Sequence, residues 1–456
     1  MTRLGSTEAP APDNAVIREI ERLTNAKLEI QYIPDYPERL NVTVASNDLP
    51  MVTLFPGGDK PSVVEVDSVR AGLFWKIGDY INNYEWLRQL DESTIQNATV
   101  DGELWGMFRT RPVVRNGLFY RSDWAENLGL SKPKNLEDLY KMLKAFVEND
   151  PDGNGKKDTY GLAQESYLRL VFAALSPAFG LGNNYDIAGG KLVATHLQPG
   201  YLEMLKFIKR LYDEGLMNRD FPTISEAQRD EMMADNYGMA ITSIDKGEFA
   251  IVSLQKLHPE ANFTVMVDFE DVKAPILGRS GFESKFYVSK KAVPQEADFI
   301  RIMEYFNVMH SPEVNNLVYN GFENIHYTKT GSNTISVSDE QRAKYNLEVL
   351  PVEQVAFRFI KNNFDVENNH PYTAQVQSFY KSYPGPVIGD PTQPLASETL
   401  NEKGNELQQL IWDAGVQFVT GSIDDRGWQA ALERWRQDGG DKMSAEYQKE
   451  YDANLK

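Results

Sequence analysis

Cysteine is absent from this chain of 456 residues. Its absence excludes disulfides, thiolate nucleophiles, Cys-ligated zinc and iron–sulfur clusters. Histidine is scarce: the five histidines are scattered and none lies four residues from another, so we expect no His-rich metal site. Long apolar runs are missing as well. The longest, Leu170 to Leu175, falls far short of the roughly 18 residues that a membrane-spanning helix needs.

Positive charge is outweighed, with 47 Lys and Arg against 66 Asp and Glu, which gives a net charge of −19. Sequence-independent binding to nucleic acid depends on a basic surface, so we expect no nucleic-acid partner. The rest of the composition, 41% hydrophobic and 25% charged, is ordinary for a globular protein, and the length favours two or three domains. The first twelve residues lack the apolar segment of a signal peptide, so the chain is either cytoplasmic or has lost a leader.

Helix and strand patterns alternate near the N-terminus. Apolar residues recur at helical spacing over 16–23, behind Asp13 or Asn14 as a cap, and a short apolar run follows at 51–55. A short run bounded by turn residues is typical of a buried parallel strand, and repeated βα units indicate a doubly wound sheet. Such sheets bind ligands beyond the carboxyl ends of their strands, which puts the turn that ends at Asp59 on a ligand-facing rim.

A second α/β pattern begins near residue 115. Asn135 is a candidate cap for a helix whose apolar face runs from Leu136 to Val147. Further strands are expected at 237–244 and 285–288, and the chain after 340 is mostly helical. The sequence therefore predicts two α/β units.

The segment that follows the Asn135 helix has the spacing of an EF-hand calcium loop. Oxygen-bearing residues or a backbone carbonyl stand at loop positions one, three, five, seven and nine: Asp150, Asp152, Asn154, Lys156 and Asp158. Gly155, at position six, permits the sharp turn, and Ca²⁺ takes six to eight oxygen ligands. We expect one structural Ca²⁺ ion here, against the alternative of a plain acidic turn that binds nothing.

Position twelve of this loop departs from the EF-hand pattern. Gly161 stands where a bidentate Glu is usual, so the missing ligand must come from Thr159, Glu165, water or another part of the chain. A single site without a paired EF-hand points to a structural role.

The stretch from residue 101 to 158 carries a specific resemblance. Its segments Asp101–Gly106, Phe119–Trp124 and Leu128–Leu130, followed by the Asn135 helix and the calcium loop, are similar to the extracellular solute-binding proteins of carbohydrate ABC transporters. The chain most resembles the branch with the alginate-binding and other uronate-oligosaccharide-binding proteins and their Gram-positive lipoprotein relatives. Two departures are Met51, where an acidic residue is usual, and Ile244, where relatives often carry a sugar-stacking Trp.

The resemblance implies the two-lobe, class II-like periplasmic-binding-protein fold, in which each lobe is a doubly wound sheet flanked by helices. By analogy the first lobe holds residues 1–115 and 281–327, and the second holds 116–280 and 328–456, including the calcium loop. The family also implies a monomer that captures an oligosaccharide by lobe closure and delivers it to ABC permease subunits. It implies secretion as a periplasmic protein or a surface lipoprotein, joined to the membrane only through a lipid on an N-terminal Cys that this Cys-free chain lacks.

The segment from Phe108 to Asn116 faces the sugar in relatives, and here it holds Arg109, Arg111 and Arg115. A guanidinium can donate two parallel hydrogen bonds to a carboxylate, so we expect an acidic, uronate-containing oligosaccharide. The alternatives are that these arginines point to solvent or pair with surface acids, and that the ligand is a neutral oligosaccharide.

Aromatic rings would complete a sugar site, because sugar C–H faces pack against them. Two clusters around Phe357 and His370 fall where relatives contribute cleft residues from the second lobe. The further candidate ligand-binding residues are Asp59, Asn116, Ser243, Lys285, Arg358, Phe359, His370 and Tyr372.

The main rival function is a polysaccharide-active enzyme, a uronate lyase or a glycoside hydrolase. No compact catalytic motif occurs, neither a G-x-S-x-G elbow nor a glycine-rich phosphate loop. We therefore expect a binding protein and not an enzyme. Presentation of the loaded form to a sensor protein is compatible with transport and stays open.

Overall fold

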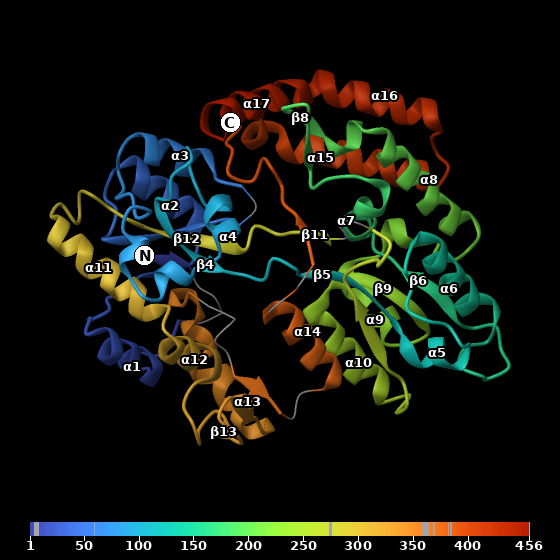
Figure 1. Cartoon of the computed structure of the whole chain (residues 1–456), viewed down its shortest axis with the longest axis horizontal. Helices are drawn as coiled ribbons and strands as arrows, with labels where there is room; N and C mark the ends of the chain where they lie inside the picture. The colour runs from blue at the N-terminus through green and yellow to red at the C-terminus, as the bar shows by residue number, and fades with distance from the viewer. Residues whose placement is uncertain are drawn as a thin grey trace.

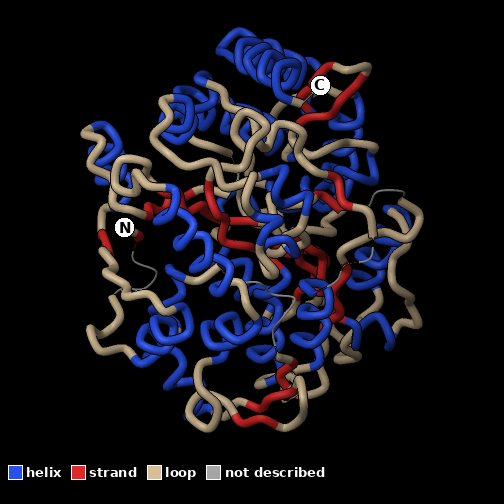
Figure 2. Tube along the Cα trace, turned by 60° about the vertical axis from the view of Figure 1, so that its left-hand side comes forward, coloured by secondary structure: helices blue, strands red, loops and turns tan. Residues whose placement is uncertain are grey.

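The computed structural model describes residues 1–3, 9–58, 60–272, 276–357, 364–367, 370–381, 383 and 385–455, with the backbone alone for 248 and 249. Two α/β lobes lie next to each other, and helices α15 (Glu398–Val419), α16 (Asp425–Trp435) and α17 (Asp441–Asn454) run across the top (Figure 1). In Figure 2 a band of strands runs through the middle of the molecule with helices around it, and further short strands lie near the top and at the bottom. Within the described residues, no helix combines the length and apolar character needed to cross a membrane.

The first lobe is built on a three-stranded sheet, in the order β3 (Val52–Pro56), β12 (Phe282–Val288) and β4 (Gly106–Thr110). Both outer strands pair with β12 in antiparallel register. The predicted parallel pairing of the run at 51–55 is therefore wrong. Its neighbour is a strand that the chain supplies only after it has built much of the second lobe, and that strand returns in the opposite direction.

Helices cover this sheet, and several of them present an apolar stripe to it. In α1 (Ala15–Thr24), for example, Val16 and Ile20 are fully buried, and the side chain of Asn14 accepts hydrogen bonds from the first free backbone N–H groups. The other helices of this lobe are α2 (Tyr36–Ala45), α3 (Val63–Arg70), α4 (Glu92–Asn97), α11 (Glu296–Met309), α12 (Pro312–Asn320) and α13 (Asp339–Glu348). The short strands are β1 (Thr2–Arg3), β2 (Tyr32–Ile33), β13 (Thr328–Lys329), β14 (Thr334–Ser336) and β15 (Asp365–Val366).

The core of the first lobe extends beyond residue 327. Val349 and Val352 are buried in it, and the Phe357 ring lies 5.2 Å from that of Phe286 and 5.4 Å from that of Phe306. These side chains pack in the first lobe, although the boundary expected from the family would put them in the second.

The second lobe is built on a four-stranded sheet in the order β10 (Phe263–Met266), β5 (Asn116–Arg121), β9 (Tyr237–Ser243) and β6 (Tyr160–Ala163). Only β6 and β9 are parallel; the other pairs are antiparallel. The predicted cap is confirmed, since Asn135 accepts a hydrogen bond from the Asp138 backbone at the start of α6 (Leu136–Glu148). The other helices are α5 (Ser122–Asn127), α7 (Arg169–Leu175), α8 (Pro199–Asp213), α9 (Glu226–Met233), α10 (Gly247–Gln255) and α14 (Pro371–Lys381), and a hairpin joins β7 (Tyr185–Ala188) to β8 (Lys191–Ala194).

Three crossing segments form the hinge between the lobes. The first follows β4, the second contains β11 (Ile276–Leu277), and the third contains β16 (Val387–Ile388), which pairs with β11 in parallel. The Arg279 backbone donates to Val113 O at 2.9 Å, and the Gly278 backbone donates to Ile388 O at 2.9 Å. The three segments are thus hydrogen-bonded side by side. They hold the two lobes next to each other and so position the residues that face each other between the lobes.

Candidate functional site: the cleft between the lobes

A pocket of about 510 Å³ is lined from both lobes and from the hinge; we call it the cleft pocket. Residues of α12 and α13 line one side of it and residues of α14 the other. Figure 1 shows these helices below the hinge. The residues that line it are Arg111, Pro112, Arg115, Asp245, Tyr319, Asn320, Arg342, Tyr345, Phe364, Val366, Tyr372, Thr373, Val376, Gln377, Tyr380 and Lys381. The lining therefore combines basic, aromatic and small polar side chains.

Cations outnumber anions in this lining, although the whole chain has a net charge of −19. Arg111 is paired behind the pocket with Glu283 and lies 3.6 Å from Glu353. Arg115 Nη2 lies 3.6 Å from Asp245 Oδ2, and the two side chains are 40% and 46% exposed. Arg115 is thus only loosely compensated and open to a ligand.

Aromatic rings form much of the second-lobe wall. Tyr372 is 2% exposed, and its hydroxyl donates to Ile244 O at 2.7 Å, which holds the ring in place. Gly247 makes room for it, because a Cβ there would lie 2.1 Å from the Tyr372 hydroxyl oxygen. Burial raises the pKa of Tyr380, and Asp245 adds to the shift while Arg115 opposes it. Tyr380 stays protonated, so its hydroxyl can donate to a sugar oxygen.

Three of the predicted ligand-binding residues come together in the cleft pocket: Arg111, Arg115 and Tyr372. His370 lies at the start of α14, where its ring Nδ1 accepts a hydrogen bond from the Tyr372 backbone at 3.2 Å. Asp59, Arg358 and Phe359 lie outside the described residues.

Arg109 is buried in the first lobe. Its side chain is 0% exposed, and it donates to the backbone carbonyls of Ala356 and Glu353, both at 2.7 Å. It also pairs with Glu283. Burial by itself would raise the pKa of Glu283, but Arg109 and Arg111 outweigh burial and lower it. These contacts join strand β4 to the segment before Phe357, so this geometry favours a structural role and not the predicted contact with sugar.

Lys285 is buried in the same sheet. Its Nζ lies 2.5 Å from Glu65 Oε1, and the two side chains are 2% and 1% exposed. Such a pair holds strand β12 against helix α3 and has no surface open to a ligand.

Asn116 and Ser243 face each other across strands β5 and β9. Asn116 lines a separate, narrower pocket beside the hinge with Gly278 and Arg279. The structure brings these two predicted residues together, but in a place other than the cleft pocket.

The predicted calcium loop curls as its spacing requires. Asp150 Oδ1 accepts from the Asn154 backbone at 3.1 Å, and Asn154 Nδ2 donates to Asp152 at 2.8 Å and Asp158 at 3.1 Å. The Lys156 backbone donates to Asn154 Oδ1 at 2.8 Å. Burial, together with the neighbouring Asp150 and Asp158, raises the pKa of Asp152. A cation would relieve this repulsion, although the described residues contain no group of three or more His, Cys, Asp or Glu arranged as a metal site.

Packing explains the glycine at position twelve of the loop. Gly161 lies in β6, and a Cβ there would be 2.2 Å from Leu216 O, so no glutamate fits. Two of the suggested replacement ligands have other partners. The Thr159 hydroxyl donates to a carbonyl of α6 at 2.8 Å, and Glu165 pairs with the buried Arg229.

Sequence reasoning missed the first-lobe wall of the cleft pocket, notably Arg342 and Tyr345 of α13. The available signal was weak. These residues stand three apart on one face of a helix that has a Ser338–Gln341 capping box but buries none of its residues.

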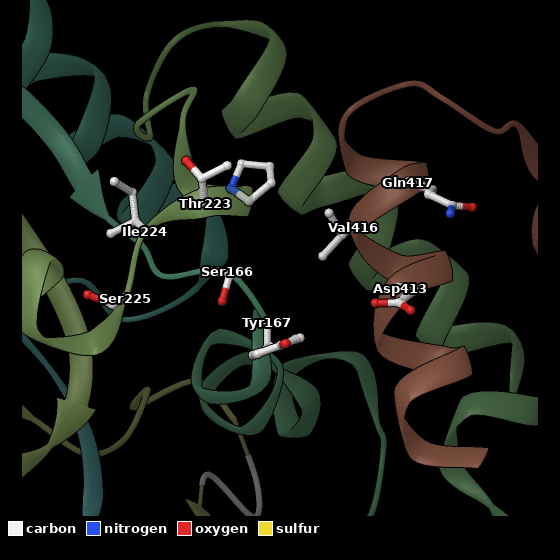
Figure 3. A pocket seen from close by; sticks show the side chains of 9 residues that line it. Ser166, Tyr167, Thr223, Ile224, Ser225, Asp413, Val416 and Gln417 are labelled. Carbon is white, nitrogen blue, oxygen red and sulfur yellow. The ribbon is translucent and has the colours of Figure 1, made fainter. Parts of the chain in front are cut away.

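A third pocket, of about 420 Å³, lies entirely within the second lobe (Figure 3). Tyr167 and Val416 face it, and Asp413 is the charged residue in its lining. A pocket with a carboxylate and no cation does not suit an acidic ligand, and lobe closure would not enclose it.

The family model of bacterial extracellular solute-binding proteins matches residues 7–315 of the chain. The polygalacturonan/rhamnogalacturonan-binding protein YtcQ of Bacillus subtilis (strain 168) is 29% identical over 96% of this chain and 88% of its own length. Lipoprotein LipO of the same organism is 30% identical over 100% of this chain and 92% of its own length.

Two solved structures show the same fold. An HMO-binding, ABC-transporter-associated solute-binding protein from Bifidobacterium longum infantis has a TM-score of 0.75 at 17% identity, with 100% of this chain and 98% of that chain covered. The alginate-binding protein AlgQ2 has a TM-score of 0.61 at 18% identity, with 97% and 95% covered. The predicted two-lobe α/β fold class is confirmed.

Relatives in this family are binding proteins of ABC transporters and not enzymes, so the prediction of a non-enzymatic binding protein is also confirmed. The family model covers well over half of the sequence, and LipO aligns with all of it. The chain belongs to the family of bacterial extracellular solute-binding proteins.

Proposed function

We propose that this chain captures an acidic, uronate-containing oligosaccharide in the cleft pocket and delivers it to the permease of an ABC importer. The single observation that carries the proposal is the composition of the pocket lining. It contains four cations, Arg111, Arg115, Arg342 and Lys381, and one carboxylate, that of Asp245, while the acids that pair with Arg111 and Lys381 stand outside the lining. A local excess of cations in a strongly acidic protein favours an anionic ligand.

The chemistry of the lining suits such a sugar. A guanidinium binds a carboxylate in a bidentate manner, and tyrosine rings pack against sugar C–H faces while their hydroxyls meet sugar oxygens. Because the walls belong to different lobes, a ligand that contacts both favours the closed arrangement. The closed, loaded protein is then the form that the permease recognises.

The names of two similar proteins support an acidic ligand. YtcQ is described as binding polygalacturonan and rhamnogalacturonan, and AlgQ2 as binding alginate. These polymers contain uronates, whose carboxylates match the cations of the cleft pocket.

Titration calorimetry with purified uronate oligomers and with neutral oligosaccharides of equal length tests this function. We expect heat of binding and a raised melting temperature with the uronate oligomers, and affinity that falls as salt is added. Mass spectrometry of the recovered sugar should show it unchanged. Binding of the neutral series alone would overturn the acidic ligand, and a cleaved product would overturn the binding-protein function.

We also propose that the loop from Asp150 to Asp158 holds one structural Ca²⁺ ion. The two Asp neighbours that raise the Asp152 pKa support this, since the loop gathers carboxylates close to one another. The solved structure of the Streptococcus pneumoniae substrate-binding protein FusA, which shares this fold, supports it too, because that protein is described as an EF-hand mutant.

Calcium binding can be tested with chelator-treated protein. Adding Ca²⁺ should raise the melting temperature of the native chain and of the control variant Asp213→Asn, whose carboxylate lies on α8. The Asp152→Asn variant should respond weakly, because a carboxylate ligand is lost. Equal melting of native protein with and without Ca²⁺ would contradict the site.

We propose finally that the protein acts as a monomer outside the cell and is joined to the membrane only through a lipid anchor. The name of LipO, a lipoprotein that aligns with the whole chain, supports this location. Fractionation of the native cells should find the protein with the membrane, released by detergent and not by salt. Size-exclusion chromatography with light scattering checks the monomer.

A further inference from the structure

The first-lobe wall of the cleft pocket contains a cation whose charge the described residues leave uncompensated. Arg342 lies in α13, whose start is fixed by the reciprocal Ser338–Gln341 hydrogen bonds. The helix is held to the first lobe at its end, where Val349 is 1% exposed. Arg342 itself is exposed and lines the cleft pocket, with Tyr345 one turn further along.

Several charged side chains near Arg342 already have partners of their own. Within α13, Lys344 Nζ lies 2.9 Å from Glu340, and Glu348 contacts the His326 ring at 3.2 Å. Across the pocket, Lys381 pairs with Asp365. In the part of the chain that the structure describes, no carboxylate lies within ion-pair distance of Arg342.

We propose that Arg342 determines specificity by binding a carboxylate of the glycan from the first lobe, opposite Arg115. This inference rests on the proposed function. Helix α13 is attached to the first-lobe core through Tyr345 and Val349, whereas Asp245 and α14 lie in the second lobe. An acidic ligand held by Arg342 and Arg115 therefore joins the two walls. Recognition of charge and closure of the cleft are then one event.

A consequence is that the site distinguishes a free uronate from its methyl ester. The ester keeps the ring, the hydroxyls and nearly the same shape, but it has no negative charge to face a guanidinium. When the ester replaces the acid, the exposed Arg342 guanidinium returns to water, so leaving it unpaired adds no burial penalty. The difference in affinity between the acid and the ester then arises wholly from the lost charged hydrogen bonds.

The test compares trigalacturonate with its fully methyl-esterified form by titration calorimetry. Arg342→Ala should weaken binding of the acid about 10- to 100-fold, the effect of a lost charged hydrogen bond, and change binding of the ester less than about twofold. Arg342→Lys should restore part of the affinity for the acid. The control Arg301→Ala removes a 79% exposed arginine from α11 and should change neither ligand.

Each outcome separates this inference from the function on which it rests. If the native chain binds the acid and Arg342→Ala binds it equally well, the assignment of Arg342 is wrong and the proposed function stands. If Arg342→Ala weakens both ligands equally, Arg342 does not recognise charge and the inference is also wrong. If the native chain binds no uronate oligomer at all, the proposed function has failed. Thermal unfolding should be unchanged by the substitution, because the side chain is exposed.

Discussion

Replacing Arg115 with alanine should weaken binding of an acidic sugar by about 1–2.5 kcal/mol, which is roughly 5- to 70-fold. A hydrogen bond from a charged donor contributes about 1.5–3 kcal/mol. Part of it is offset because Arg115 already contacts Asp245 at 3.6 Å, and a pair as exposed as 40% and 46% is worth about 0–1 kcal/mol. The ligand must replace this weak pair. The loss of binding free energy in Arg115→Ala is therefore smaller than it would be for an arginine that has no partner within the protein.

Asp245 supplies the matched control for this prediction. Asp245→Asn frees Arg115 and removes a carboxylate that repels the ligand, so it should tighten binding of the acid by about 0.5–1 kcal/mol and leave a neutral sugar unaffected. Calorimetry at two salt concentrations measures both variants, and the Arg115→Ala effect should shrink at high salt. Unchanged affinity in Arg115→Ala would refute the reasoning, as would weaker binding of the acid by Asp245→Asn.

Three further predictions concern stability. Gly161→Ala should lower the free energy of unfolding by about 2–3 kcal/mol in urea titration, because its Cβ would meet a backbone oxygen at 2.2 Å; a neutral effect would mean that β6 can shift. Burial lowers the pKa of His196 to about 3 and of His310 to about 4. Both histidines therefore stay neutral in the folded chain at pH values where the same side chains become protonated in the unfolded chain, whose histidine pKa is near 6.5. The free energy of unfolding should fall by about 2 kcal/mol per histidine from pH 6.5 to 5, and His310→Gln should halve this fall. An equal fall in the native chain and in His310→Gln would contradict the prediction. Lys285→Met should lower the free energy of unfolding by about 3–5 kcal/mol, because the buried Glu65 would keep its hydrogen bond from Tyr287 but lose its cationic partner. Adding Glu65→Gln should restore most of this loss. Lower sugar affinity in folded Lys285→Met would instead support the predicted ligand role of Lys285.

Local features of the fold could be predicted from the sequence, because they depend on neighbours in the chain. The caps at Asn14 and Asn135 and the curl of the loop after Asp150 follow from side chains that bond to nearby backbone. The direction of strand β3 could not be predicted, since its neighbour β12 arrives from a distant part of the chain. An apolar run signals burial in a sheet but not the direction of the strand beside it.

The three clustered arginines show the same limit within the site. Arg109, Arg111 and Arg115 are separated by even numbers of residues, so strand alternation would put them on one face. Strand β4 ends at Thr110, however, and beyond that point the alternation no longer applies. Arg109 therefore points into the first lobe, whereas Arg111 and Arg115 reach the cleft pocket. Arg342 reaches the same pocket from a helix far along the chain, a proximity that only the tertiary fold creates.

The central position of β12 has a consequence for how the protein is made. A nascent chain that has emerged only as far as residue 270 holds β3 and β4 but not the strand that lies between them. Both strands then expose unpaired edges, which are prone to aggregation, while all of the second lobe's sheet strands are already present. The lobe that comes first in the sequence is thus completed late, and an exported chain must be kept from premature association until its middle section arrives.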